Sequence, residues 1–81
     1  MSSEALVRMA NQIATFFKAQ DIASAPAATA DHLLKFWEPR MRAEIIALRA
    51  ADVAGLDPIA AAAVDLLPRP VEKSAARAPL S

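Results

Sequence analysis

An amphipathic helix is predicted by residues 3–20, which read SEALVRMANQIATFFKAQ. Large apolar residues at helical spacing gather into one stripe, made of Leu6, Met9, Ile13, Phe16 and Phe17. We expect Ser3 to be the N-cap and Glu4 to lie near the positive end of the helix dipole. Core packing is the expected use of the stripe. The adjacent amides of Asn11 and Gln12 offer directional hydrogen bonds to a partner or form part of a solvated face.

A linker is predicted at residues 21–28, because Pro26 is not tolerated in a helix interior. A second helix is expected to start after Thr29, a good N-cap residue. This helix should bend or stop near Trp37 and Glu38, because the residue before a proline is disfavoured in the α region.

Two further helices follow in the sequence. Pro39 suits the first turn of a third helix that runs to about Ala54, with Gly55 as its C-cap. Asp57 and the proline after it predict the start of a fourth helix, which should end at Leu67. The residues that this helix is expected to bury are Ile59, Ala62 or Ala63, Leu66 and Leu67.

The fold class that follows is all-α, a small bundle of three to four short helices with an extended C-terminal tail. A single glycine and an abundance of alanine favour helices throughout. Residues 1–67 are expected to form the helical domain. Residues 68–81 contain proline and alanine with little large apolar content, so this tail should be disordered alone or docked on a partner.

The residue types exclude most chemistry in this chain. The sequence has no cysteine, so disulfides and iron–sulfur sites are impossible, and one histidine cannot make a multi-histidine zinc site. That histidine, His32, lacks a positioned catalytic partner and is expected on a helix surface or at an interface. A single glycine rules out a glycine-rich phosphate loop. We therefore expect no catalytic, cofactor-binding or metal-binding residue.

Charge and hydropathy restrict the location and the partners. Nine basic residues balance nine acidic ones, whereas nucleic-acid binding normally needs an excess of Lys and Arg. Uncharged stretches are far shorter than the ~20 residues that span a membrane. No signal peptide is visible, so the expected location is the cytoplasm. A chain of 81 residues also has a small core, which makes a partner surface a candidate source of stability.

The most informative stretch is residues 32–42, HLLKFWEPRMR. Adjacent helix residues point about 100° apart, so Phe36 and Trp37 cannot share one narrow seam. Either ring could fill the core while the other anchors an interface, or both could be core residues beside solvated arginines. Trp and Arg are enriched at interface hot spots. The predicted partner interface consists of Asn11, Gln12, Phe36, Trp37, Pro39, Arg40, Met41 and Arg42.

Three blocks of the sequence resemble the delta subunit of NAD-dependent formate dehydrogenase. The first is Leu6–Ile13 followed by Phe16-Phe17. The second is residues 32–42, through the pattern His-Leu-x-x-Phe-Trp-x-Pro-Arg-Met. The third, shorter block is Gly55–Pro58. Of these, the run Phe-Trp-x-Pro-Arg-Met is the most specific.

The resemblance implies a non-catalytic accessory subunit of a cytoplasmic complex that oxidises formate to CO₂ and reduces NAD. It implies that this chain binds the large alpha subunit and supports assembly or stability. The molybdenum or tungsten bis-pterin guanine dinucleotide is then expected on the alpha subunit. Iron–sulfur clusters, FMN and NAD are expected on partner subunits, which include beta and gamma.

Two other readings share the predicted fold. One is a free-standing small helical adaptor or regulator of another protein, which differs from the subunit only in its partner. The other is a small nucleic-acid-binding module that uses Arg40, Arg42 and Arg49, and the balanced charge counts against it.

Overall fold

Four helices make up the structure, a computed structural model that describes residues 2–68. In chain order they are α1 (Ser3–Gln20), α2 (Ala25–Phe36), α3 (Pro39–Ala50) and α4 (Pro58–Asp65). The described part contains no β-strand, and the predicted all-α bundle is confirmed. The bounds of the first helix agree with the prediction. Apart from Pro68, the predicted C-terminal tail lies outside the described residues.

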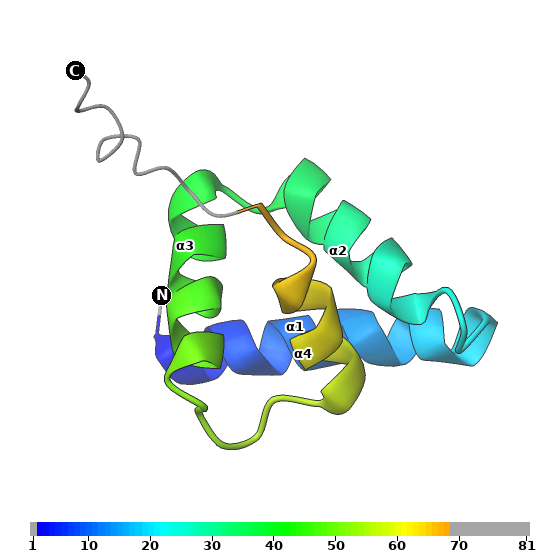
Figure 1. Cartoon of the computed structure of the whole chain (residues 1–81), viewed down its shortest axis with the longest axis horizontal. Coiled ribbons are helices and arrows are strands. Elements are labelled where there is room, and N and C mark those ends of the chain that lie inside the picture. Colours follow the sequence, from blue (N-terminus) through cyan, green and yellow to red (C-terminus); the bar gives the residue numbers. More distant parts are fainter. Residues whose placement is uncertain (1, 69–81) are drawn as a thin grey trace.

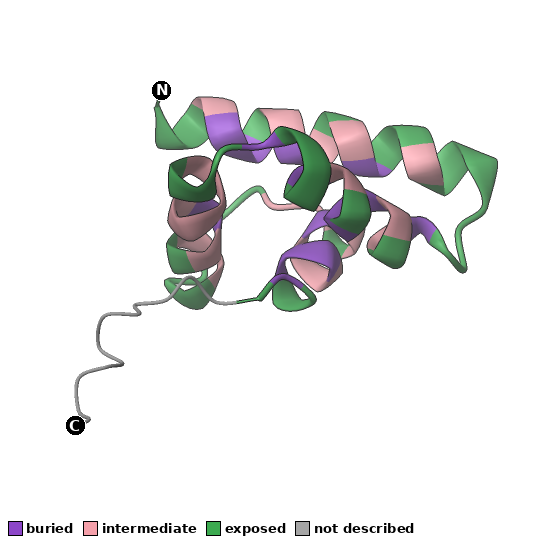
Figure 2. Ribbon diagram, turned by 90° about the horizontal axis from the view of Figure 1, so that it is seen from above, coloured by how far each residue is buried: buried purple, intermediate pink, exposed green. Residues whose placement is uncertain are grey.

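Helix α1 is the long base on which the other helices rest (Figure 1). Helices α2 and α3 each pack on α1, and α4 packs against all three of the others. In Figure 1, α4 lies between α2 and α3. The buried faces of the four helices therefore meet around α4, while the outer sides of α1 and α2 stay exposed (Figure 2).

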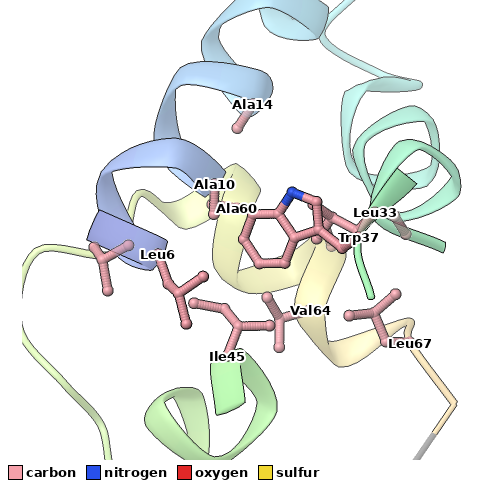
Figure 3. Packing of buried hydrophobic residues seen from close by; sticks show 12 residues of the cluster. Leu6, Ala10, Ala14, Leu33, Trp37, Ile45, Ala60, Val64 and Leu67 are labelled. Atoms are coloured by element: carbon pink, nitrogen blue, oxygen red, sulfur yellow. The ribbon is translucent and has the colours of Figure 1, made fainter. Parts of the chain in front are cut away.

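The core combines a few large side chains with many alanines. Its fully buried large apolar residues are Leu6, Leu33 and Ile45, and Trp37 and Val64 lie between them (Figure 3). Alanines at the helix contacts let the backbones approach closely, so a small number of large side chains closes the interior.

The stripe predicted for α1 is wrong at its C-terminal end. The residues that α1 buries are Leu6, Val7, Ala10 and Ala14. Met9 and Ile13 are only partly buried and pack at the edge of the core, and Phe16 is 57% exposed. In the C-terminal half of α1, the fully buried position is therefore the small residue Ala14, whereas Phe16 lies at the surface.

The N-cap of α1 and the start of α2 differ from the prediction. The N-cap of α1 is Ser2, whose side chain accepts a 3.1 Å hydrogen bond from the Ala5 N–H. Helix α2 begins at Ala25, so Pro26 lies in its first turn, where a proline removes no helical hydrogen bond. Thr29 is therefore not an N-cap. It lies inside α2, fully buried.

The third helix ends four residues earlier than predicted, in a Schellman motif. The Val53 N–H donates to the Leu48 carbonyl (3.1 Å), and the Asp52 N–H donates to the Arg49 carbonyl (3.0 Å). Asp52 takes the left-handed position with φ 60°. Gly55 also has positive φ, 94°, but it lies in the connection to α4 and caps no helix.

The predicted start of the fourth helix is confirmed. The Asp57 carboxylate accepts from the Ile59 N–H at 2.8 Å and caps α4. The predicted buried set is partly wrong: the buried residues of this segment are Ala60, Ala63, Val64 and Leu67. Leu66 is 57% exposed, because the chain leaves the helix after Asp65 and the next two side chains no longer share one face.

Candidate interaction surface

Trp37 and Phe36 differ sharply in burial. Helix α2 ends at Phe36, and Trp37 has extended backbone angles (φ −88°, ψ 144°) that turn its side chain inward. The indole lies in the middle of the core and is 6% exposed (Figure 3). Phe36 is 70% exposed. Of the alternatives that the sequence leaves open, the structure selects Trp37 as the core residue and Phe36 as the surface residue.

Arg42 closes the turn between α2 and α3. Its guanidinium donates to the Trp37 carbonyl and, at 3.4 Å, to the Leu34 carbonyl. These carbonyls lie at the C-terminal end of α2, where a helix has no internal donors left and where positive charge is favourable. Arg42, predicted at a partner interface, thus has a structural use within the chain.

The rest of this stretch divides between surface and core. Pro39 is the first residue of α3 and is exposed, as is Arg40 beside it. Met41 is partly buried and packs against the core cluster. Among the residues predicted at the interface in this stretch, Phe36, Pro39 and Arg40 are therefore the accessible ones.

Asn11 and Gln12 also differ in their surroundings. The Asn11 side chain donates to the Gly55 carbonyl and accepts from the Asp57 N–H, both at 2.8 Å. It thus holds the connection between α3 and α4 against α1. Gln12 is exposed and makes no hydrogen bond from its side chain within the described residues, so it remains available to a partner.

Three phenylalanines and the histidine form a row across α1 and α2, which we call the aromatic face: Phe16, Phe17, His32 and Phe36. The Phe16 and Phe17 ring centroids are 5.1 Å apart, those of Phe17 and His32 are 6.1 Å apart, and those of His32 and Phe36 are 4.7 Å apart. All the phenylalanines of the chain belong to this row, while its one tryptophan fills the core.

A shallow hollow of about 240 Å³ adjoins the aromatic face, lined by Gln12, Ile13, Phe16, Phe17 and His32. No lining residue carries a permanent charge. The sequence contained a signal for this face that the prediction missed: His32 and Phe36 are four residues apart in a helix, so their side chains share one side. This side of α2 faces the C-terminal end of α1. Spacing within a single helix cannot predict such a contact between two helices.

A second hollow of about 510 Å³ lies on the other flank of α1, against the connection that follows α3. Val7 and Val53 supply apolar surface there, and Glu4 and Arg8 stand on its α1 side. Gln12 lines both hollows, so the two lie on either side of this residue.

The strongest electrostatic contact of the described residues joins α3 to α4. Arg49 donates to both carboxylate oxygens of Asp65, through Nε at 3.0 Å and Nη2 at 2.9 Å. The hydrogen bond from Arg49, with its positive charge, holds the pKa of Asp65 below the usual value. Both side chains are partly exposed to solvent, and neither belongs to the aromatic face.

No cluster of three or more metal-ligating side chains occurs in residues 2–68. His32 contacts aromatic rings, and no carboxylate or nucleophile is hydrogen-bonded to it within the same part of the chain. In the described residues, none of the helices combines the length and the apolarity needed to cross a membrane. What the site offers is therefore an accessible apolar surface with polar residues at its border.

Comparison with protein families gives a match. The model of the family described as NADH-dependent formate dehydrogenase delta subunit FdsD matches residues 5–64. This range contains all four helices apart from the ends of α1 and α4, together with the whole aromatic face. Neither the curated proteins nor the solved structures gave a match.

Proposed function

The chain belongs to the FdsD family of delta subunits of NADH-dependent formate dehydrogenase, and we propose that it is a non-catalytic accessory subunit that binds the large alpha subunit. In this role it supports the assembly or the stability of the complex. The observation that carries the proposal is the aromatic face, because it gathers all three phenylalanines of the chain in one row that includes two exposed rings.

The exposure of this face is costly for an isolated protein. Phe36 is 70% exposed and Phe16 is 57% exposed. Fully burying a phenylalanine side chain contributes about 1.5–3 kcal/mol, so both rings gain from contact with another surface. Exposed apolar patches of this kind mark interaction sites. Arg40 and Pro39 lie close in sequence to Phe36 and are also accessible, so they belong to the border of the proposed interface.

Binding of a partner also supports a small chain by mass action. A partner that binds only the folded form shifts the unfolding equilibrium toward that form. The core contains a single large aromatic side chain and is otherwise built from aliphatic residues and alanines. The alpha subunit therefore supplies, through the aromatic face, apolar burial that the isolated chain does not achieve.

The donor groups of this chain do not fit the redox groups of a formate dehydrogenase. There is no cysteine for an iron–sulfur cluster, and His32 lies between the rings of Phe17 and Phe36 rather than beside other ligands. We therefore place the molybdenum or tungsten bis-pterin guanine dinucleotide, the iron–sulfur clusters, FMN and NAD on the partner subunits alpha, beta and gamma. The proposed location of the assembled complex is the cytoplasm.

The test is reconstitution of the complex with matched surface variants. The full chain, tagged, is co-expressed with the alpha, beta and gamma subunits of the same host and recovered by affinity. The informative variant is Phe16→Ser, and Leu66→Ser is its control, because both side chains are 57% exposed and only Phe16 lies on the aromatic face. We expect Phe16→Ser to lower recovery of the alpha subunit at least tenfold and Leu66→Ser to leave it unchanged.

Equal recovery with both variants would remove the aromatic face from the interface. Absence of the alpha subunit from the wild-type eluate would overturn the proposed function itself. An unrelated protein recovered in its place, in an amount that depends on Phe16, would support the alternative of a free-standing adaptor.

A further inference from the structure

The larger hollow on α1, which we call the α1 groove, has one wall that hydrogen bonds hold in place. Its far side is the connection after α3, where the Schellman motif fixes Val53 through the Leu48 carbonyl. The same connection is tied to α1 by the two hydrogen bonds of Asn11. The groove of about 510 Å³ therefore lies between two parts of the chain that are held at a set separation.

The α1 side of the groove carries two charges of opposite sign. Glu4 and Arg8 are four residues apart on α1, and both are exposed. On α2, the pair Asp31 and Lys35 has the same spacing and forms an ion pair of 3.1 Å. Among residues 2–68, neither Glu4 nor Arg8 forms an ion pair with any residue. Both charges consequently remain available for groups outside the described chain.

We propose that the α1 groove receives an amphipathic helix of the alpha subunit, an inference that rests on the proposed function. Glu4 and Arg8 are separated by about 6 Å along the helix axis, the rise of four helical residues. A helix that packs along the groove presents a basic and an acidic side chain at the same separation. The basic group faces Glu4 and the acidic group faces Arg8.

The floor of the groove is apolar, as the contact face of an amphipathic helix requires. An aliphatic side chain on the same face of the incoming helix rests on Val7 and Val53, both of which line the groove. Gln12 lines both the groove and the hollow beside the aromatic face. The opposed charges of Glu4 and Arg8 set the direction of the bound helix along α1, since a reversed helix would place like charges together.

The test measures the affinity of the full chain for a complex of the other subunits prepared without it. Ala54→Arg fills the groove with a long side chain, because Ala54 is exposed and lines it. Ala47→Arg is the matched control, since Ala47 is an exposed alanine on α3 that does not line the groove. We expect Ala54→Arg to raise the dissociation constant at least tenfold and Ala47→Arg to change it less than twofold.

The charges are tested separately by neutral substitutions. Arg8→Gln should raise the dissociation constant threefold to tenfold, whereas Lys18→Gln, which removes the same charge from α1 outside the groove, should not. The double variant Glu4→Gln with Arg8→Gln should also bind with a weaker dependence on salt than the wild type. Circular dichroism of each variant checks that the helices are retained.

Equal affinities for Ala54→Arg and Ala47→Arg would overturn the groove proposal. If Phe16→Ser still weakened binding in that case, the proposed function would stand and the partner would be confined to the aromatic face. Failure of the wild-type chain to bind the other subunits would instead overturn the proposed function, and the groove proposal with it.

Discussion

The side-chain amide of Asn11 donates a 2.8 Å hydrogen bond to the carbonyl oxygen of Gly55, a residue 44 positions further along the chain. The same side chain accepts from the Asp57 N–H, which opens the cap of α4. One polar residue in the middle of α1 thus sets both the position of the α3–α4 connection and the start of the last helix. This connection is also the far wall of the α1 groove.

Replacing Asn11 should therefore destabilise the fold. Asn11→Ala leaves a backbone carbonyl and a backbone N–H without their partner, and we expect a loss of about 1–3 kcal/mol in the free energy of unfolding. Urea denaturation followed by circular dichroism measures this loss. Gln12→Ala is the control and should stay within about 0.5 kcal/mol of the wild type, because the Gln12 side chain is exposed. Equal stability of the two variants would contradict the role assigned to the two hydrogen bonds of Asn11.

The two adjacent aromatic residues should have opposite effects on stability and binding. Trp37→Ala removes the central core side chain at a cost of about 3–5 kcal/mol, which is as large as the net stability of most domains of this size. We expect this variant to be largely unfolded. Phe36→Ala should keep its thermal transition near that of the wild type and lose affinity for the alpha subunit. A folded Trp37→Ala chain would contradict the assignment of the core.

The buried hydroxyl of Thr29 should be dispensable. Its oxygen is fully buried and has no hydrogen-bond partner among residues 2–68. Thr29→Val keeps the shape and removes the unsatisfied polar group, so we expect a gain of about 1 kcal/mol in the free energy of unfolding. The thermal transition of the variant measures it. Thr29→Ser keeps the hydroxyl and loses a methyl group, so this control should be less stable than the wild type.

The end of α3 offers a test of backbone strain. Asp52 has φ 60°, where glycine pays no steric penalty, so Asp52→Gly should stabilise the chain by about 0.5–1 kcal/mol. Ala51, the preceding residue, has φ −82°, so Ala51→Gly should destabilise the chain by a comparable amount. Chemical denaturation of both variants gives the sign of each change in the free energy of unfolding. The same sign for both would contradict the Schellman motif.

The contact between Arg49 and Asp65 predicts a dependence of stability on pH. The pKa of Asp65 is lowered in the folded state, chiefly by the hydrogen bond from Arg49. A lowered pKa contributes stability at pH values above the unfolded value of about 3.9, and this contribution is lost as the pH falls through the folded-state pKa. Carboxyl titration by NMR should give a low pKa for Asp65 that returns to the usual value in Arg49→Gln. A pKa of Asp65 that stays low in Arg49→Gln would show that Arg49 is not what lowers it.

Much of the secondary structure could be predicted from local patterns. The all-α class and the bounds of α1 follow from periodicity, and the start of α4 follows from Asp57 and the proline after it, because a cap depends on a few adjacent residues. The end of α3 could not be predicted in this way. Gly55 was the more obvious cap, yet the helix ends at the Schellman motif, where Val53 reaches apolar neighbours of the core.

The candidate site could likewise be predicted only in part from the sequence. The sequence identified Phe36 and Trp37 as an informative pair, since adjacent helix residues cannot face the same seam. It could not decide which ring is buried. That choice depends on the turn at the end of α2 and on the space between α1 and α4, both of which are settled only when the helices pack.

The sequence by itself thus determined the helical class, the absence of cysteine, and the motifs that resemble the FdsD family. The tertiary structure alone decided that Phe16, Phe17, His32 and Phe36 form one face, and that the Asn11 side chain holds the fold together while the Gln12 side chain is exposed. The physical reason is the range of the interactions. Helical periodicity and capping act within a few residues, whereas burial depends on which surfaces meet across the whole chain.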